Sequence, residues 1–256
     1  MSRALIGHTG FVGGTLFRAC SFTHVFNTSN FRELAGQRFD EIICAGIPAV
    51  KYIANREPEQ DWLQISALLS VLEQTRTGRF VLISTIDVYP DPSQPLDEDA
   101  ALEGLPNQPY GRHRLAAERF IAGRFPSHAI VRLPALFGEG LKKNALFDLL
   151  HDNMVEKINP AAEFQWYPTH RLAGDLEHIA RVDLRLVNLV TAPMPMREVI
   201  ARHFPHAQVG PEVLPAPRYN LRTRHAALFG GAGGYAMAAQ QVMEAMDAFI
   251  AQARQP

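Results

Sequence analysis

The chain has 256 residues, of which 47% are hydrophobic and 20% charged, and its formal net charge is −1 at pH 7. This composition is typical of a globular protein with a buried core, and it argues against a nucleic-acid partner or an acidic membrane surface. No apolar run approaches the roughly 20 residues that span a bilayer. Cys20 and Cys44 lie in apolar segments, so we expect a cytoplasmic protein without disulfides.

The first half of the chain alternates short apolar runs with segments of helical periodicity. We expect strands at 4–6, 24–26, 41–44, 79–86 and 129–133, and helices at 11–18, 58–75 and 110–125. In the second helix, Trp62, Ile65, Leu69 and Leu72 recur at helical spacing. Strands that are apolar throughout are typical of a parallel sheet covered on both faces. The alternation predicts an α/β fold with a doubly wound, Rossmann-type parallel sheet.

The second half is less regular. A strand is expected at 184–190, a helix at 196–203, a proline-rich connection at 211–218 and a closing helix at 235–253. The glycine-rich stretch 229–235 has no strand before it, so we interpret it as a loop or a lid hinge.

These patterns suggest two domains. We expect residues 1–140 to form the dinucleotide-binding core. Residues 141–256 are expected to be mixed segments, part returning to the core and part forming a small C-terminal substrate cap.

Three glycines, Gly7, Gly10 and Gly13, stand between the first strand and the first helix. In such a turn one glycine allows the tight bend, one lets the backbone approach a pyrophosphate, and one allows close helix–strand packing. The helix N-terminus adds N–H donors and a favourable dipole. The alternative is a flexible turn. The glycine stretch, however, stands at the start of an alternating α/β chain, and this position favours a phosphate site. The neighbouring residues of this predicted site are Thr9, Phe11 and Val12.

Three further segments follow in a fixed order: ISTIDVY at 83–89, PYGRHRLAAE at 109–118 and IVRLPALFG at 130–138. Together with GHTGFVG at 7–13, they resemble the extended short-chain dehydrogenase/reductase family, the nucleotide-sugar epimerases and dehydratases. The resemblance is good over residues 3–140 and weak beyond. It implies an NAD(P)-dependent oxidoreductase or epimerase that acts by hydride transfer on a carbonyl or hydroxyl of a sugar or nucleotide sugar.

The resemblance also implies the catalytic residues. In the family, a Ser or Thr and a Tyr bind the reacting oxygen, and these match Thr85 and Tyr110. A Lys four residues after the Tyr supports that Tyr and holds the nicotinamide ribose, but here the residue is Arg114. Arginine is always charged, so it can stabilise a tyrosinate but cannot relay a proton at neutral pH.

Two alternatives stay open at this point. Arg114 can instead belong to a solvated helix face, with His113 as a surface neighbour. The change from Lys to Arg also leaves room for a dinucleotide-binding protein with little catalysis, such as a redox sensor or scaffold. Family dehydratases follow the Thr with an Asp-Glu pair; here Ile86 and Asp87 follow, which argues against a dehydratase.

The second strand bears on the choice of cofactor. NAD-preferring members usually end this strand with an acidic residue that binds the ribose 2′-hydroxyl. Here Asn27 stands at that end and no carboxylate follows until Glu33. We expect Asn27, Ser29 and Asn30 to accept a 2′-phosphate, with Arg32 as the nearby cation, which favours NADP over NAD. The resemblance places further cofactor contacts at Ala45, Gly46 and Pro134.

Two later segments are candidates for substrate contacts. In 138–144, the adjacent lysines suit a diphosphate, although such pairs are often solvent-exposed. In 165–171, aromatic and cationic side chains suit stacking on a base or sugar, or else a packed cap. The expected substrate-binding residues are Ser84, Asp87, Lys142, Lys143, Asn144, Gln165, Tyr167 and Arg171.

The remaining expectations concern metals and assembly. The histidines show no metal-ligand spacing, so no metal site is predicted. The resemblance implies a homodimer formed through the helices at 58–75 and 111–125. Trp62 and Leu69 are the candidate interface residues, unless they pack within the monomer.

Overall fold

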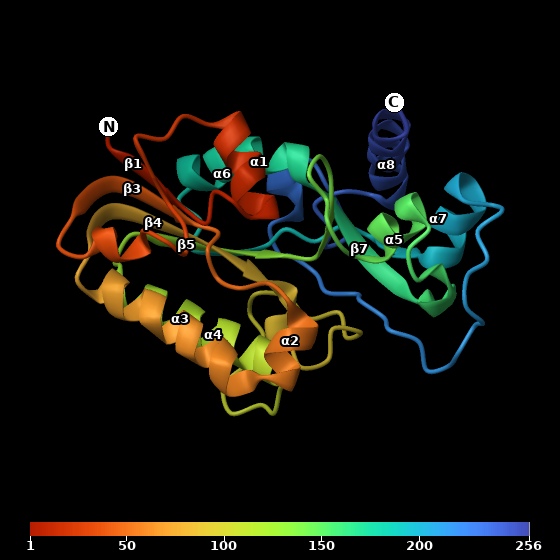
Figure 1. The fold of residues 1–256 in the computed structure, drawn as a ribbon, viewed down its shortest axis with the longest axis horizontal. Coiled ribbons are helices and arrows are strands. Elements are labelled where there is room, and N and C mark those ends of the chain that lie inside the picture. The colour runs from red at the N-terminus through yellow and green to blue at the C-terminus, as the bar shows by residue number, and fades with distance from the viewer. Residues whose placement is uncertain (256) are drawn as a thin grey trace. The chain divides into compact units, whose positions relative to one another are not determined.

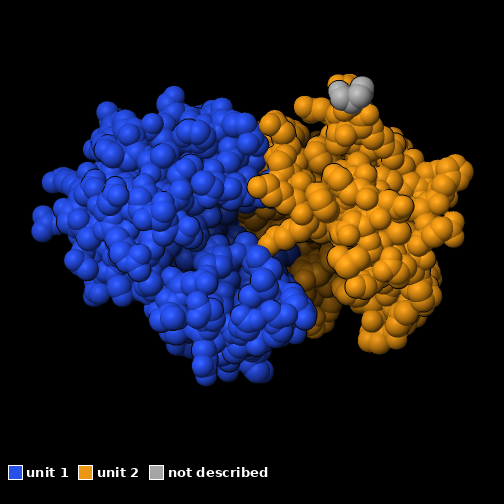
Figure 2. Space-filling model, in the orientation of Figure 1, with its two compact units in different colours: residues 1–90, 101–132, 173–187 blue, residues 91–100, 133–172, 188–256 orange. Residues whose placement is uncertain are grey.

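The computed structural model describes residues 1–255, which form two compact units (Figure 2). Unit 1 comprises residues 1–90, 101–132 and 173–187. Unit 2 comprises residues 91–100, 133–172 and 188 onward.

Unit 1 is built on a six-stranded parallel sheet in the order β2-β1-β3-β4-β5-β8 (Figure 1). Its strands are β1 (Arg3–Ile6), β2 (His24–Phe26), β3 (Arg38–Cys44), β4 (Arg76–Thr85), β5 (His128–Leu133) and β8 (Leu186–Asn188). Ile6 of β1 pairs with Phe26 on one side and Cys44 on the other, so these three strands end at one edge. The chain runs from β1 to one neighbour and then crosses to the other. The crevice at such a switch point is where open α/β sheets bind ligands.

Helices cover both faces of this sheet. α1 (Phe11–Ala19) and α6 (Leu172–Arg181) lie over one face, and α3 (Pro58–Glu73) and α4 (Pro109–Arg124) over the other (Figure 1). The apolar side of α3 packs into the core through Ile65 and Leu69. The predicted Rossmann-type fold is therefore confirmed.

Unit 2 contains a three-stranded sheet in the order β6-β7-β9. Its elements are β6 (Ala135–Phe137), β7 (Glu163–Pro168), β9 (Pro193–Pro195), α5 (Ala145–His151), α7 (Met196–His203) and α8 (Ala239–Ala253). Phe137, Trp166 and Met246 share a buried cluster. The sequence analysis did not predict β6, β7, β9, α5 or α6. The strands β6 and β9 have only three residues each and α5 has seven, but α6 is clearly amphipathic and was overlooked.

Several predicted boundaries were wrong. The closing helix begins at Ala239, because Gly233 and Gly234 adopt positive φ angles of 64° and 87° and keep the preceding segment in a turn. The strand expected at 184–190 spans only Leu186–Asn188. Ile86 opens a single 3-10 turn, η2 (Ile86–Val88), instead of ending β4. Among the described helices, none has both the length and the apolar character that a membrane crossing demands.

Candidate active site

The glycine turn closes tightly on the end of β3. Gly7 has a φ of +88°, and its N–H donates to the Phe26 carbonyl at 2.7 Å. A Cβ on Gly7 would lie 2.5 Å from the Ala45 oxygen, and one on Gly13 would lie 2.0 Å from the Gly7 oxygen. The turn, Ala45 and Gly46 are thus brought together as expected, and only glycine fits at positions 7 and 13.

Gly13→Ala is accordingly expected to destabilise the protein by about 1–3 kcal/mol, because the added methyl collides with backbone that cannot rotate away. Gly14→Ala is the matched control: there a Cβ would meet nothing closer than 3.5 Å. Denaturant unfolding of both variants measures the difference. Equal stabilities for the two variants would contradict the geometry.

The start of α1 has the character of an anion site. Gly10 is its N-cap, with no side-chain capping bond and no acidic residue in the first turn. Thr9 and Gly10 are exposed. The first N–H groups of a helix lack intrahelical partners, so a pyrophosphate can accept hydrogen bonds here. The cradle therefore fits the phosphates of a nicotinamide dinucleotide.

The turn after β2 is organised by its own side chains. Asn27 Oδ1 accepts bonds from the Ser29 amide at 2.8 Å and the Ser29 hydroxyl at 2.6 Å. Arg32 is exposed beside the Phe31 ring. The sequence reasoning missed His8, whose Nδ1 lies 3.1 Å from the Phe26 oxygen at the end of β2. His8 could have been noticed because it lies inside the glycine motif, which follows the first strand.

Tyr110 is positioned by the first turn of α4. Its N–H donates to Asn55 Oδ1 at 2.9 Å. At the next residue, a Cβ on Gly111 would lie 2.1 Å from the Asp87 oxygen, so α4 packs directly on η2. The Thr85 side chain lies near the Tyr110 phenol and lowers the pKa of that phenol. The two predicted oxygen-binding residues are therefore neighbours.

The surroundings of Tyr110 favour its neutral form. Burial raises the pKa of the phenol, and so does the Asp87 carboxylate. Arg114, the Thr85 side chain and Lys51 lower that pKa, but together they do not cancel the burial. The family resemblance led us to expect a Tyr110 pKa lowered towards neutrality. In the protein without cofactor the pKa is raised instead, so Tyr110 is a neutral phenol at pH 7.

Arg114 is buried and paired, and not on a solvated helix face. Its Nη1 and Nη2 donate to the two carboxylate oxygens of Asp61 at 2.5 and 2.8 Å. Nη2 also donates to the Pro48 carbonyl. The guanidinium carbon lies 4.0 Å from the centre of the Tyr110 ring, a cation–π distance. His113, expected at the surface, is buried too, with Nδ1 at 2.7 Å from Asp61.

Asp61 was missed from the sequence, although a carboxylate stands there one turn before Ile65 on the buried side of α3. Burial raises the pKa of this carboxyl, but hydrogen bonds from Arg114 and His113 outweigh burial and leave the pKa below its usual range. Asp61 is therefore ionised, and it is hydrogen-bonded to the permanently charged Arg114.

Ser84 and Asp87 are engaged inside unit 1. The Ser84 hydroxyl donates to Glu118 Oε1 at 2.5 Å, and Glu118 pairs with Arg132 at 2.7 Å. Asp87 accepts from Lys51 at 2.7 Å. Their substrate roles stay predictions.

The other expected substrate residues lie in unit 2, where several have structural partners. The Gln165 amide nitrogen donates to the Thr191 and Leu221 carbonyls at 2.6 and 2.8 Å. Asn144 caps α5 through its side-chain oxygen. The remaining substrate candidates are buried Tyr167, exposed Lys142 and Lys143, and Arg171, which donates to the Phe229 carbonyl. Pro134, expected to contact the cofactor, lies between β5 and β6.

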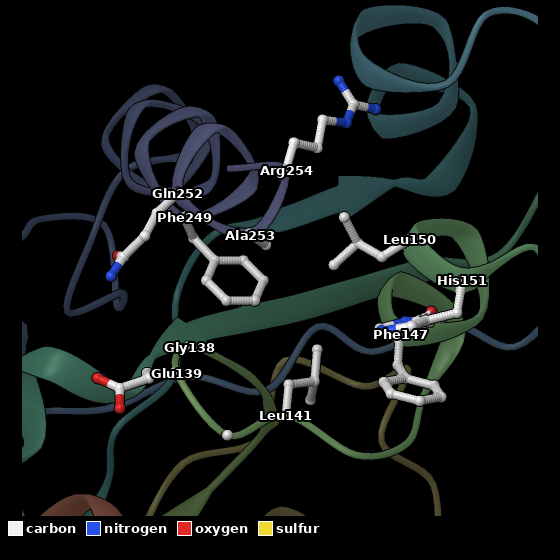
Figure 3. Close-up of a pocket in the computed structure, with 11 residues that line it drawn as sticks. Gly138, Glu139, Leu141, Phe147, Leu150, His151, Phe249, Gln252, Ala253 and Arg254 are labelled. Atoms are coloured by element: carbon white, nitrogen blue, oxygen red, sulfur yellow. Dashed lines mark hydrogen bonds between the residues drawn. The ribbon is translucent and has the colours of Figure 1, made fainter. Parts of the chain in front are cut away.

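Unit 2 also contains a cavity of about 450 Å³ (Figure 3). It is lined by the loop at 138–141 and by residues of α5 and α8, including Phe147, Leu150 and Phe249. The rest of its lining is mixed, because Glu139, His151, Gln252 and Arg254 stand beside the apolar residues. Within residues 1–255, no group of three or more His, Cys, Asp or Glu side chains is placed to hold a metal ion.

The sheet order, with a glycine turn at its switch point, defines a Rossmann-type α/β protein. The sequence model of the NAD dependent epimerase/dehydratase family matches residues 23–166. The chain belongs to this family, so the resemblance indicated by its motifs is confirmed. No curated protein matches the sequence.

Solved structures of similar fold cover nearly the whole chain. "MoeE5 in complex with UDP-glucose and NAD" has a TM-score of 0.76 at 16% identity, covering 99% of each chain. The NAD dependent NDP-hexosamine 5,6-dehydratase TunA, involved in tunicamycin biosynthesis, has a TM-score of 0.72 at 19% identity, covering 97% of this chain and 98% of its own. RMD from Pseudomonas aeruginosa, complexed with NADPH, has a TM-score of 0.68 at 19% identity, covering 92% and 94%.

Proposed function

We propose that this protein is an NAD(P)-dependent oxidoreductase or epimerase that acts on a nucleotide-sugar carbonyl or hydroxyl by hydride transfer. The observation that carries the proposal is the placing of buried Tyr110 beside Thr85 at the end of β4, in the same unit as the glycine cradle. The UDP-glucose and NAD bound to the similar MoeE5 support the substrate and cofactor classes.

Each residue then has a chemical task. The nicotinamide, when bound, supplies or accepts the hydride. Gly7, Gly10 and Gly13 hold the pyrophosphate at the start of α1. Thr85 orients the substrate oxygen, and Tyr110 donates its phenolic proton to that oxygen when a carbonyl is reduced. Because the Tyr110 pKa is raised, the proton is in place at neutral pH. Oxidation needs the phenolate and is favoured at alkaline pH.

We further propose a preference for NADP. Within Asn27–Arg32 no carboxylate is present to bind a ribose 2′-hydroxyl, while Arg32 is exposed beside this turn. Arg32 and His8 supply positive or donor groups for a 2′-phosphate.

Thermal unfolding with NADP, NAD and UDP-glucose tests cofactor binding and the preference together. We expect NADP to raise the melting temperature more than NAD at equal concentration, since ligand binding to the folded state stabilises it. Arg32→Ala is expected to remove this difference. A shift with NAD alone would contradict the preference, and no shift with either dinucleotide would contradict the proposed function.

The second candidate is a dinucleotide-binding protein with little catalysis. The full engagement of Arg114 by Asp61 favours it, because that cation is not free to move with a reacting oxygen. Cofactor binding without turnover across a panel of nucleotide sugars would support this candidate.

The homodimer stays a prediction. Leu69 is buried in the core of unit 1 and is not available to a second copy. Trp62 and Leu63 are exposed on α3, so they are the residues through which we propose that two copies meet.

A further inference from the structure

A chain of polar groups leads from Tyr110 through Thr85 and Asp87 to Lys51. The Tyr110 phenol lies near the Thr85 side chain, which lowers the pKa of the phenol. Thr85 Oγ1 accepts from the Asp87 N–H at 3.1 Å and lies 3.4 Å from Asp87 Oδ2. The other carboxylate oxygen, Oδ1, accepts from Lys51 Nζ at 2.7 Å. The phenol is thus connected to a lysine that the family motif does not contain.

The lysine is held in place by the helix that carries it. α2 (Lys51–Arg56) packs against α3 and α4. Asn55 of this helix accepts the Tyr110 N–H at 2.9 Å and donates to Gln108 Oε1 at 2.7 Å. Ala54 is buried in the same contact region. The short helix is therefore fixed to the first turn of α4, which carries Tyr110.

Arg114 also acts on the phenol, and among the groups that lower the Tyr110 pKa its effect is the largest. Arg114 is about 3% exposed, and its two terminal nitrogens bind both oxygens of Asp61. The Arg114–Asp61 pair is neutral overall, and Arg114 Nη2 also donates to the Pro48 carbonyl. Lys51 is nearly half exposed, and an ammonium on a flexible stem can adjust to a charge that appears during reaction.

We propose that Lys51, paired with Asp87, is a second positioning residue that stabilises the charged form of Tyr110, beside Arg114, which stands where the family resemblance expects a lysine. Four groups face the phenol or its partners: Arg114 on α4, Asp87 on η2, Thr85 at the end of β4 and Lys51 on α2. Asp61 and His113 reach it only through Arg114. The consequence for turnover rests on the proposed function; the consequence for Tyr110 ionisation does not.

The test is a titration of Tyr110 in the cofactor-free protein. Incorporation of 3-fluorotyrosine lowers the intrinsic pKa of each phenol, and fluorine NMR follows ionisation while the protein is folded. The Tyr110 signal is the one absent from Tyr110→Phe. Lys51→Met is expected to raise the Tyr110 pKa, because the carboxylate of Asp87 is left without its cation.

Three further variants sharpen the result. Lys51→Arg keeps the charge and is expected to titrate as the wild type. Asp87→Asn removes the carboxylate that opposes ionisation, so Tyr110 is expected to titrate at a lower pH in this variant. Lys157→Met removes an exposed lysine of unit 2 and is expected to change nothing.

An unchanged Tyr110 titration in Lys51→Met, or an equal shift in Lys157→Met, would overturn the inference. The titration uses neither cofactor nor substrate, so a protein without turnover leaves its outcome intact. A loss of turnover in Lys51→Met with normal Tyr110 ionisation would overturn the role of Lys51 and leave the proposed function standing.

Discussion

Tyr110→Phe is expected to lower turnover about 10²–10⁴-fold, the usual contribution of a positioned general acid or base, while dinucleotide binding is retained. The substitution removes one hydroxyl and keeps the ring on which the Arg114 guanidinium packs. The glycine cradle is formed by other segments, so cofactor affinity does not depend on this oxygen. Steady-state kinetics with a responsive nucleotide sugar, beside a cofactor titration, measures both quantities.

Tyr52→Phe makes the same chemical change on an exposed side chain and serves as the control. The pH profile adds a second check. Because the pKa of Tyr110 is raised, wild-type oxidation is expected to rise with pH into the alkaline range, and reduction to fall there. Tyr110→Phe should lose this dependence. A Tyr110→Phe variant with wild-type turnover would remove Tyr110 from the chemistry.

Asp61→Ala is expected to cost about 3–5 kcal/mol in free energy of unfolding, since it strands a buried guanidinium. Both side chains of the Arg114–Asp61 pair are 4% exposed or less, so water does not replace the lost carboxylate. Chemical denaturation of the variant measures the cost. Asp99→Ala is the matched control: Asp99 pairs with Arg224 at the surface, where ion pairs contribute about 0–1 kcal/mol.

The same pair predicts a pH dependence. The pKa of Asp61 is depressed in the folded protein, so its contribution to stability is present above the ordinary carboxyl range and is lost as pH falls through the folded value. In Asp61→Asn, the free energy of unfolding should depend less on pH over this acidic range. Equal costs for Asp61→Ala and Asp99→Ala would show that the buried pair does not stabilise the fold.

The sequence was sufficient for the sheet of unit 1 because its signals are local. Apolar runs such as 79–85 and the glycines at 7–13 follow from backbone geometry and burial, which act within a few residues. The motif order also placed Thr85 and Tyr110 in the site. Unit 2 was predicted poorly, since strands of three residues such as β6 and β9 carry too little periodicity to be recognised.

The charged partners could not be predicted for a different reason. Asp61 and Arg114 are 53 residues apart, and Lys51 and Asp87 are 36 apart, so each pair exists only after the helices pack on the sheet. Sequence reasoning therefore found a cation at position 114 but could not see that Asp61 holds it. It likewise had no means of placing α2 against the start of α4.

The most direct test of hydride transfer by this site is the nicotinamide spectrum during a single turnover. Wild type and Tyr110→Phe are saturated with oxidised NADP or NAD and mixed with UDP-glucose and other nucleotide sugars. We expect reduced nicotinamide to form in the wild type with at least one sugar, and not in Tyr110→Phe. Bound cofactor that stays oxidised in the wild type with every sugar would contradict this expectation.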